Sequence, residues 1–412
     1  MQIDTPICSV IIPVFNKWEL TKNCLASLCE HSVGHNIEVI VVNNGSSDET
    51  ATELQPYGRT LFGERFLAIT FSENKNFGPA CNAGAQAATS SVLFFLNNDT
   101  LLTPEWLPPL LDGLYTLGIR GAVGPLLLYE DGSVQHLGVT YGLVGPFHLY
   151  SHFPVSHPVV SRKRKLQSLT GAAFMIRTDF FRECGEFHEA YRNGFEDLDL
   201  CIQIQQRGGK LRCIPTSRIY HLESQTPGRK KHEDYNSELF TQRCAKALHV
   251  DLHHHFQRDG FSYFINDLLT ISPKLKEEDA LVLTKKAQGQ DAPSWLHLVR
   301  ENPYWIYGRE VLAQSYERQK YYTEAAIFRA ELTDIEPLIK RYKDLLRLTP
   351  FVENPSWQDT AESHYNIMLR LRNDWDYARA SMAKKQQRLR HAQDTLLEKA
   401  LMAKMAEWFP QG

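Results

Sequence analysis

The sequence predicts an α/β fold, with a mostly parallel sheet and flanking helices, followed by an all-α C-terminal domain. In the first 127 residues, short β-branched and other apolar runs alternate with helix-like segments. These runs are almost unbroken, which is typical of parallel strands covered by helices on both faces. Beyond about residue 250, long helical patterns replace them. We therefore expect an α/β domain at 1–250, a helical linker region at 251–300 and an α-helical accessory domain at 301–412.

The expected strands and helices of the first part follow one another along the chain. The first strand is expected in CSVIIPVF and the first helix in WELTKNCLASLCE. Further strands are expected in IEVIVVNN, FLAITFSEN and SSVLFFLNND. The Gly-rich stretch from about 128 to 222 adds strands in DGSVQHLGV, SLTGAAFMIR and LRCIPTSRIYHLE, and a helix in GFEDLDLCIQIQQRGG.

The C-terminal part has helical patterns throughout. The segment KLKEEDALVLTKKAQGQDAP indicates a solvated helix that runs into a linker. One tetratricopeptide-like spacing is formed by Leu312, Ala313, Tyr316, Tyr322, Ala325 and Pro337. A second candidate, around Tyr365, Leu369, Trp375 and Ala378, keeps only an aromatic and an alanine, so a generic helical bundle and a repeat array both stay open. A last helix, expected from roughly 378 to 409, suits packing, self-association or peripheral membrane contact.

Charge and cysteine usage narrow the class of protein. The 45 Lys and Arg residues nearly balance the 48 Asp and Glu residues, so no global basic field indicates nucleic acid. The eight cysteines form no CxxC pair, which favours reduced thiols over a metal knuckle. The sequence shows no signal peptide and no apolar run of membrane-spanning length. We expect a cytoplasmic protein that is either free or bound peripherally to the inner face of the membrane.

Polar side chains collect where the expected strands end. Asn16, Asn43 and Asn44 follow the first two strands, and Asn97, Asn98 and Asp99 follow the strand VLFFL. The carboxyl ends of parallel strands form the ligand crevice of such sheets, which suits a nucleotide. Asp99 could anchor Mg²⁺ or Mn²⁺, because these ions need only one or two carboxylates beside phosphate oxygens. The alternative is an N-cap by Asp99 or Thr100 on the helix expected in LLTPEWLPPLLDGL.

Three further candidates lie downstream. Glu196 and Asp197 begin an amphipathic helix, where they either favour the helix dipole or supply a general base that deprotonates a hydroxyl. His221 follows a short strand and is either a metal ligand or a structural histidine. The basic loop with Arg229, Lys230 and Lys231 is either a phosphate-binding lid or a solvated loop.

Taken together, eight segments in this order resemble family-2 glycosyltransferases, in particular their rhamnosyltransferase-like branch, across roughly residues 6–245. The segments are SVIIPVFN, EVIVVNNGSSDET, NFGPACNAGAQAA, LFFLNNDT, DGSVQHLGV, LTGAAFMIR, GFEDLDL and IYHLES. The resemblance implies the GT-A fold, a nucleotide-diphosphate sugar as donor and a divalent cation, Mn²⁺ or Mg²⁺. It also implies an inverting transfer to a hydroxyl of a saccharide, lipid-linked saccharide or glycoconjugate acceptor, in surface polysaccharide or glycoconjugate synthesis.

The resemblance also assigns roles to residues of this sequence. It implies donor contacts that begin at the base pocket and the ribose, from Pro13, Val14, Phe15, Asn16, Asn43, Asn44, Ser46, Asn76, Gly78, Asn82, Asn98 and Gly171. Asn98 and Asp99 match the end of a DXD-type motif, with Asp99 as the metal-binding carboxylate. Asp197 matches the catalytic base of the pair that it forms with Glu196, and His221 matches a histidine that completes the metal shell.

The sequence departs from the family pattern at several positions. Asn43 stands where Asp is usual, Gln203 where Arg is usual and His188 where Asp is usual, and the stretch from Asn76 to Asn82 is shortened. These departures leave open an assembly protein that carries a weakly active or silent transferase domain. A nucleotide-sugar hydrolase or a nucleotidyltransferase is a third reading, although VIIPVFNKWEL lacks the Gly-rich, Arg-containing loop of nucleotidyltransferases.

Overall fold

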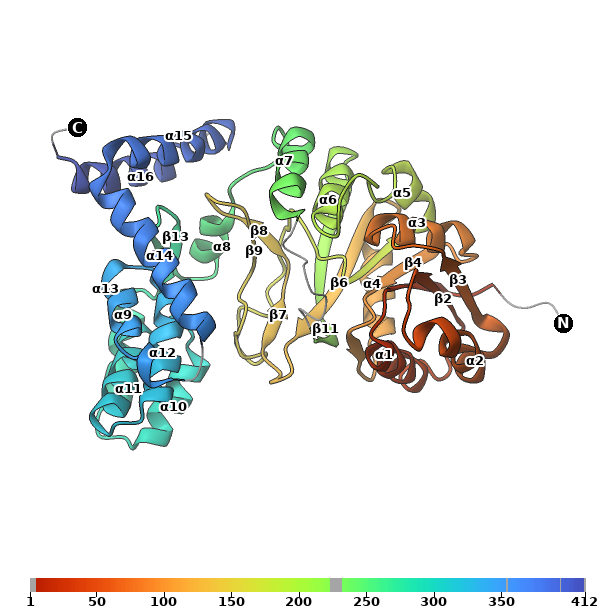
Figure 1. Cartoon of the computed structure of the whole chain (residues 1–412), viewed down its shortest axis with the longest axis horizontal. Coiled ribbons are helices and arrows are strands. Elements are labelled where there is room, and N and C mark those ends of the chain that lie inside the picture. Colours follow the sequence, from red (N-terminus) through yellow and green to blue (C-terminus); the bar gives the residue numbers. More distant parts are fainter. Residues whose placement is uncertain (1–4, 223–231, 353–354, 393, 411–412) are drawn as a thin grey trace. The chain divides into compact units, whose positions relative to one another are not determined.

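The structure is a computed structural model of the 412-residue chain, and it describes residues 5–222, 232–352, 355–392 and 394–410. The chain forms two compact units (Figure 1). The first comprises residues 1–140 and 148–248, and the second comprises residues 141–147 and 249–412. The finer division, with a separate linker at 251–300, stays a prediction.

The first unit is built on one mixed sheet. Its strands are β1 (Cys8–Val14), β2 (Ile37–Asn44), β3 (Phe66–Phe71), β4 (Val92–Leu96), β5 (Thr100–Leu102), β6 (Gly121–Leu128), β7 (Val134–His136), β10 (Ala173–Arg177) and β11 (Lys210–His221). The strand order is β3-β2-β1-β4-β10-β6-β11-β5, with β7 paired to β6. Strands β1 to β4 are parallel where they pair, whereas β10 runs antiparallel to both of its neighbours. The predicted α/β class with a mostly parallel sheet is confirmed.

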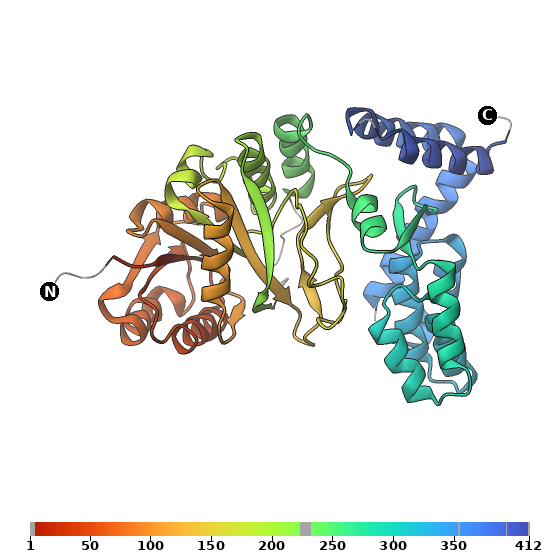
Figure 2. The ribbon, with the colours of Figure 1, turned by 180° about the vertical axis from the view of Figure 1, so that it is seen from behind.

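Helices cover both faces of this sheet, as Figures 1 and 2 show. The helices of the unit are α1 (Trp18–Glu30), α2 (Thr50–Phe62), α3 (Phe77–Ala87), α4 (Leu107–Leu117), α5 (Thr178–Glu183), α6 (Glu196–Gln206) and α7 (Glu233–Cys244). Val10 of β1 shares one buried cluster with Leu25 of α1 and Leu110 of α4. On the other face, a Cβ on Gly84 of α3 would lie 2.4 Å from Cγ2 of Ile11. Glycine therefore lets α3 approach β1 closely.

One expectation about the neighbourhood of Asp99 is wrong. The cap interpretation placed Asp99 or Thr100 at the start of a helix, but Thr100–Leu102 form β5 and α4 begins only at Leu107. Strand β5 pairs antiparallel with β11, and in this register His221 lies opposite Thr100. Asp99 therefore lies in the turn between β4 and β5 and does not cap a helix.

The second unit is largely helical, as predicted, with one addition. Its helices are α8 (Leu252–Arg258), α9 (Glu277–Ala287), α10 (Ala292–Glu301), α11 (Ile306–Arg318), α12 (Tyr322–Ile335), α13 (Ile339–Leu346), α14 (Pro355–Asn373), α15 (Trp375–Ala392) and α16 (Thr395–Trp408). The addition is the hairpin of β12 (Ser262–Ile265) and β13 (Ile271–Lys274). The single last helix expected from roughly 378 to 409 is wrong, because α15 and α16 are separate and Asp394 caps α16.

Helices α11 and α12 pack against each other, with Ala313 and Ala325 fully buried. These are two of the small residues on which the repeat interpretation rested.

Among the described helices, none is both long enough and apolar enough to cross a membrane.

Candidate functional site

Two hydrogen bonds join the loops after β1 and β2, and a third lies within the loop after β2. The Asn16 N–H donates to Ser46 Oγ at 2.8 Å, and the Ser47 N–H donates to Asn16 Oδ1 at 2.8 Å. The Ser46 N–H donates to Asn43 Oδ1 at 2.9 Å. An Asp at position 43 would accept the same bond, so Asn43 keeps this loop contact although the family usually has Asp there.

The Asn44 side chain forms hydrogen bonds with the neighbouring turn of residues 74–76. Its amide nitrogen donates to Asn74 Oδ1 at 3.1 Å and to the Asn76 carbonyl at 3.0 Å. Its amide oxygen accepts from the Lys75 N–H at 2.8 Å. The residue thus positions the turn that leads into α3, at Asn76, whose φ is 71°.

The other residues expected at the base pocket differ in exposure. Val14 is 1% exposed and belongs to the core of the unit, so its side chain faces away from solvent. Phe15 is 42% exposed, and Pro13 is half-buried within β1. An open pocket of about 740 Å³ adjoins Asn16, but its lining includes Glu19, Asp48, Glu49 and Glu53 with Lys17 as the one cation. Its acidic lining disfavours a diphosphate.

Asp99 and His221 lie together at the edge of the sheet. His221 Nε2 is 3.2 Å from Asp99 Oδ1, and both side chains are largely buried. The Leu222 N–H donates to the Asp99 carbonyl at 2.8 Å, which continues the β5–β11 pairing. This pairing brings together two residues that are 122 positions apart in the sequence.

Gln135 of β7 fixes the orientation of His221. The Gln135 amide nitrogen donates to the His221 carbonyl at 2.9 Å, and Gln135 Oε1 lies 2.7 Å from His221 Nδ1. Because the amide oxygen can only accept, Nδ1 carries a proton that it donates to Gln135, and Nε2 faces Asp99. A second partner that sets the tautomer in this way is typical of histidine metal ligands.

The pair fits a divalent cation. An imidazole nitrogen and a carboxylate oxygen face each other at 3.2 Å. Two ligands at right angles on a cation with bonds of about 2.1 Å lie roughly 3 Å apart. Asn97 Nδ2 is 3.5 Å from the same His221 Nε2, so Asn97 borders this site. Asn98 instead donates to Thr21 Oγ1 on α1 at 2.9 Å.

Asp197 is held by two backbone N–H groups. The Gly171 N–H donates to its Oδ2 at 2.7 Å, and the Leu198 N–H donates to its Oδ1 at 2.8 Å. A Cβ on Gly171 would lie 3.1 Å from Cβ of Asp197, so residue 171 contacts the carboxylate side chain directly. The next residue, Ala172, accepts a hydrogen bond from the Asn97 N–H at 2.8 Å. The short segment 171–172 thus links Asp197 to the strand end that carries Asp99.

Glu196 and Asp199 are buried on the same helix. Glu196 accepts from the Gly194 N–H at 2.7 Å. Asp199, which is 1% exposed, forms an ion pair with Arg243 of α7 and accepts from Tyr191 Oη at 2.9 Å and from Gln203 Nε2 at 3.1 Å. Arg243 therefore supplies a cation near Gln203, which stands where the family usually has Arg. No local sequence pattern indicates the pairing of Asp199 with Arg243.

Asn82 of α3 positions the segment that precedes α6. Its side chain donates to the Phe187 carbonyl at 2.9 Å and accepts from the Phe187 N–H at 3.1 Å. Gly78 has only ordinary van der Waals space against Phe187 and His188. Burial and the nearby Arg243 lower the pKa of His188, which favours its neutral form.

A pair of histidines lies beside His221. His136 Nδ1 is 2.9 Å from His148 Nδ1, and the Thr170 N–H donates to His136 Nε2 at 3.4 Å. Burial and the neighbouring imidazoles of His148 and His221 hold the pKa of His136 well below its usual range. His136 and Gln135 belong to the DGSVQHLGV segment, which carried no residue-level assignment. The basic loop with Arg229, Lys230 and Lys231 lies outside the described residues.

Comparisons with known proteins can now be set beside this geometry. Residues 9–185 match the family described as Glycosyl transferase family 2. The chain is 30% identical over 228 residues to the O-antigen biosynthesis protein RfbC of Myxococcus xanthus, covering 53% of this chain and 18% of that protein. It is 28% identical over 230 residues to N-acetylgalactosaminyltransferase 6 of Drosophila melanogaster, covering 53% of this chain and 34% of that protein. The matched part is thus about a third or less of these relatives.

Two solved structures are also similar. One is GalNAc-T7 with UDP, GalNAc and Mn²⁺, at a TM-score of 0.46 and 19% identity, covering 59% of this chain and 51% of that one. The other is the mannosyltransferase PcManGT of Pyrobaculum calidifontis with GDP-Man and Mn²⁺, at a TM-score of 0.44 and 15% identity, covering 90% and 88%. The mixed, mostly parallel sheet with helices on both faces agrees with the GT-A fold that the resemblance implied. Residues 9–185 of this chain therefore form a glycosyl transferase family 2 domain.

Proposed function

We propose that the chain is a metal-dependent, inverting glycosyltransferase that moves a sugar from a nucleotide-diphosphate donor to a hydroxyl acceptor. The observation that carries this proposal is the arrangement of Asp99, His221 and Gln135. Gln135 binds Nδ1 of His221 and so directs Nε2 at the Asp99 carboxylate, 3.2 Å away. An oxygen and a neutral imidazole nitrogen are suitable ligands for Mn²⁺ or Mg²⁺.

In this mechanism, a cation held by Asp99 and His221 would stabilise the charge of the departing nucleoside diphosphate. Asp197 accepts the proton of the acceptor hydroxyl as its oxygen attacks the anomeric carbon. The Gly171 and Leu198 N–H groups hold both Asp197 oxygens, so the base is oriented before the acceptor binds. A single displacement inverts the anomeric configuration.

The family-2 match and its relatives support a substrate class. The similarity to an O-antigen biosynthesis protein supports a saccharide or lipid-linked saccharide acceptor in surface polysaccharide synthesis. Rhamnose is the sugar favoured by the sequence resemblance. All eight cysteines are free, which agrees with the expected action in the cytoplasm.

A donor screen followed by product analysis tests the proposal. Thymidine-, uridine- and guanosine-diphosphate sugars are titrated calorimetrically with Mn²⁺ present, and the sugar of the tightest donor is then followed by NMR during transfer to saccharide acceptors. We expect Mn²⁺-dependent binding of one donor and a product of inverted configuration. Binding without any transfer would favour the silent-domain alternative, and a retained configuration would contradict the displacement.

A further inference from the structure

Two histidines and an aspartate meet in the second unit, apart from the transferase site. His253 and His254 lie in the first turn of α8, and Asp394 lies at the start of α16. One ligand atom from each of the three lies within 4.8 Å of the other two. His253 is 2% exposed, the Asp394 side chain 10% and the His254 side chain 64%, so the cluster runs from the interior to the surface.

The buried part of this cluster lacks hydrogen bonds. His253 Nε2 lies 2.6 Å from Asp394 Oδ2, but the contact does not have hydrogen-bond geometry. Among the described residues, neither ring nitrogen of His253 has a hydrogen-bond partner, and Asp394 Oδ2 has none either. Buried polar atoms without a partner cost roughly 1–3 kcal/mol each, so folded proteins normally provide one.

A metal ion would supply the partner that these buried atoms lack. An imidazole nitrogen and a carboxylate oxygen each offer a cation a lone pair. Tyr263 packs edge-on against the His253 ring at 5.3 Å and limits its movement.

We propose that His253, His254 and Asp394 bind a Zn²⁺ ion. Two imidazoles and one carboxylate form a ligand set that zinc accepts, whereas Mg²⁺ and Mn²⁺ favour oxygen. Tetrahedral ligands with bonds of about 2.0–2.1 Å lie roughly 3.3 Å apart. The two observed nitrogen-to-Oδ2 separations, 2.6 Å and 3.9 Å, lie on either side of that value. The exposed His254 can adjust by rotation of its side chain.

The site would fasten α8 to the junction of α15 and α16. Asp394 Oδ1 already accepts from the Leu397 N–H at 3.0 Å and so caps α16, which leaves Oδ2 for the metal. One carboxylate would then fix both the start of α16 and its attachment to α8. This role is structural, and it is separate from the cation expected at Asp99.

Zinc titration of the full-length protein, prepared without a polyhistidine tag, tests the proposal. The Asp99→Ala variant serves as background, so that the transferase site contributes no cation. Competition with a chromophoric chelator should show one equivalent of Zn²⁺ bound. The cysteines should not compete, since seven of the eight are buried and burial raises the pKa of those thiols above its usual range.

Variants identify the ligands. His254→Gln removes an exposed side chain and should leave folding intact while it weakens Zn²⁺ binding by roughly 10²-fold or more. Asp394→Asn keeps the cap oxygen of α16 and should weaken binding similarly. His297→Gln, an exposed histidine of α10, is the matched control and should bind as the background does. Absence of Zn²⁺ binding in the background protein, or unchanged affinity in both ligand variants, would overturn the proposal.

Discussion

Asp197 is oriented by main-chain groups on both of its oxygens. The donors are the N–H groups of Gly171 at 2.7 Å and Leu198 at 2.8 Å. Asp197→Asn keeps the shape of the side chain but removes its ability to accept the acceptor proton. We expect turnover to fall by roughly 10²-fold or more, with donor affinity nearly unchanged. Initial rates and donor calorimetry on the same preparation measure the two effects, and near-normal turnover would exclude Asp197 as the base.

Gln135 acts on the proposed cation only through His221. Gln135→Leu removes the acceptor that fixes the His221 tautomer, so metal affinity should fall about 10–100-fold. Gln135→Glu retains an acceptor toward Nδ1 and should restore much of that affinity. Mn²⁺ titration followed by electron paramagnetic resonance measures both variants. Equal affinities in wild type and Gln135→Leu would show that Gln135 does not position the ligand.

Local sequence signals predicted those elements whose stability is mostly local. The segments WELTKNCLASLCE and IEVIVVNN coincide with α1 and β2, because each carries its own apolar pattern. Strand β5 was not predicted, because its three residues form a strand only through pairing with β11, more than 115 residues later. The division between α15 and α16 had a local signal in Asp394 and Thr395, the Asp being a frequent N-cap residue.

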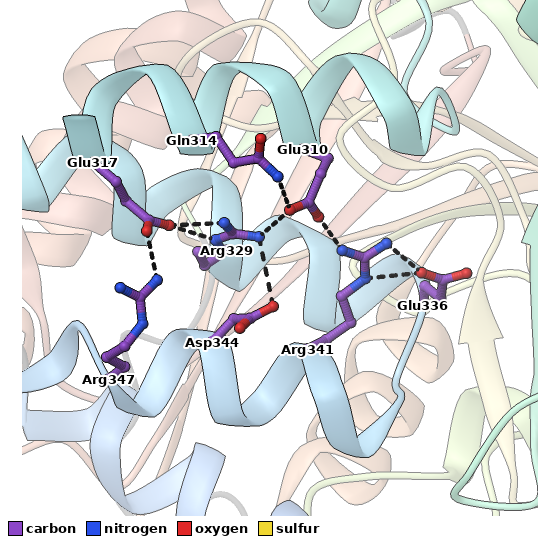
Figure 3. A network of polar contacts seen from close by, with 8 residues as sticks. All are labelled: Glu310, Gln314, Glu317, Arg329, Glu336, Arg341, Asp344 and Arg347. Atoms are coloured by element: carbon purple, nitrogen blue, oxygen red, sulfur yellow. Dashed lines mark hydrogen bonds and ion pairs between the residues drawn. The ribbon is translucent and has the colours of Figure 1, made fainter. Parts of the chain in front are cut away.

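Helices α11, α12 and α13 are joined by an ionic network (Figure 3). Arg329, 4% exposed, pairs with Glu310 at 2.7 Å and with Glu317 at 2.8 Å, and Glu310 also pairs with Arg341. Burial acts to raise the pKa of Glu310, but hydrogen bonds from Arg329 and Gln314 and the charges of Arg329 and Arg341 outweigh it and lower the pKa to about 2. The stabilisation is complete above pH ~4.5, the usual Glu value, and is lost as the pH falls toward about 2.

The network predicts a pH-dependent effect of one substitution. Glu310→Gln should lower the free energy of unfolding by roughly 1–3 kcal/mol at pH 7, because it leaves buried charges of Arg329 and Arg341 less compensated. The difference from wild type should shrink as the pH falls from 4.5 toward 2. Urea unfolding across this range measures it. Glu324→Gln, which changes an exposed carboxylate of α12, is the control and should change stability by less than about 0.5 kcal/mol. A difference independent of pH would contradict the assignment.

At the scale of the whole molecule, residues 141–147 belong to the second unit, although in sequence they lie between the two segments of the first unit. Tyr141 and Asp251 exchange two hydrogen bonds, at 2.8 Å and 3.0 Å, and Arg388 donates to the Leu143 carbonyl at 2.9 Å. Tyr141 and Leu143 are buried. Truncation near residue 250 removes these partners and exposes apolar surface on a segment that stays in the chain.

We therefore expect a chain that ends near residue 250 to bind donor, since Asp99, Asp197 and His221 all remain, but to aggregate more than the full-length protein. Light scattering and donor titration separate the two effects. Replacing Tyr141 and Leu143 with Ser in the truncated chain should reduce aggregation. Loss of donor binding in a soluble truncated protein would show that the two units do not function independently.

The sequence pattern indicated the strand ends and the acidic pair of Glu196 and Asp197. It did not indicate which of these residues lie close together in the fold. Asp99 and His221 meet through the β5–β11 register, and Asp197 reaches the same region through residues 171–172. Each of these contacts joins segments far apart in the chain, so no local pattern encodes it. The family resemblance supplied the grouping in advance, whereas Gln135, Arg243 and the ligands proposed for Zn²⁺ became visible only in the fold.

The central claim is that Asp99 and His221 hold a cation that binds the donor diphosphate. Calorimetric titration of the nucleoside diphosphate selected by the donor screen, with and without Mn²⁺, tests it in wild type, Asp99→Asn and the control Asp179→Asn, which changes an exposed carboxylate of α5. We expect Mn²⁺ to strengthen binding at least about ten-fold in wild type and in the control, and to have no effect in Asp99→Asn. Equal enhancement by Mn²⁺ in Asp99→Asn, or no enhancement in wild type, would contradict the account.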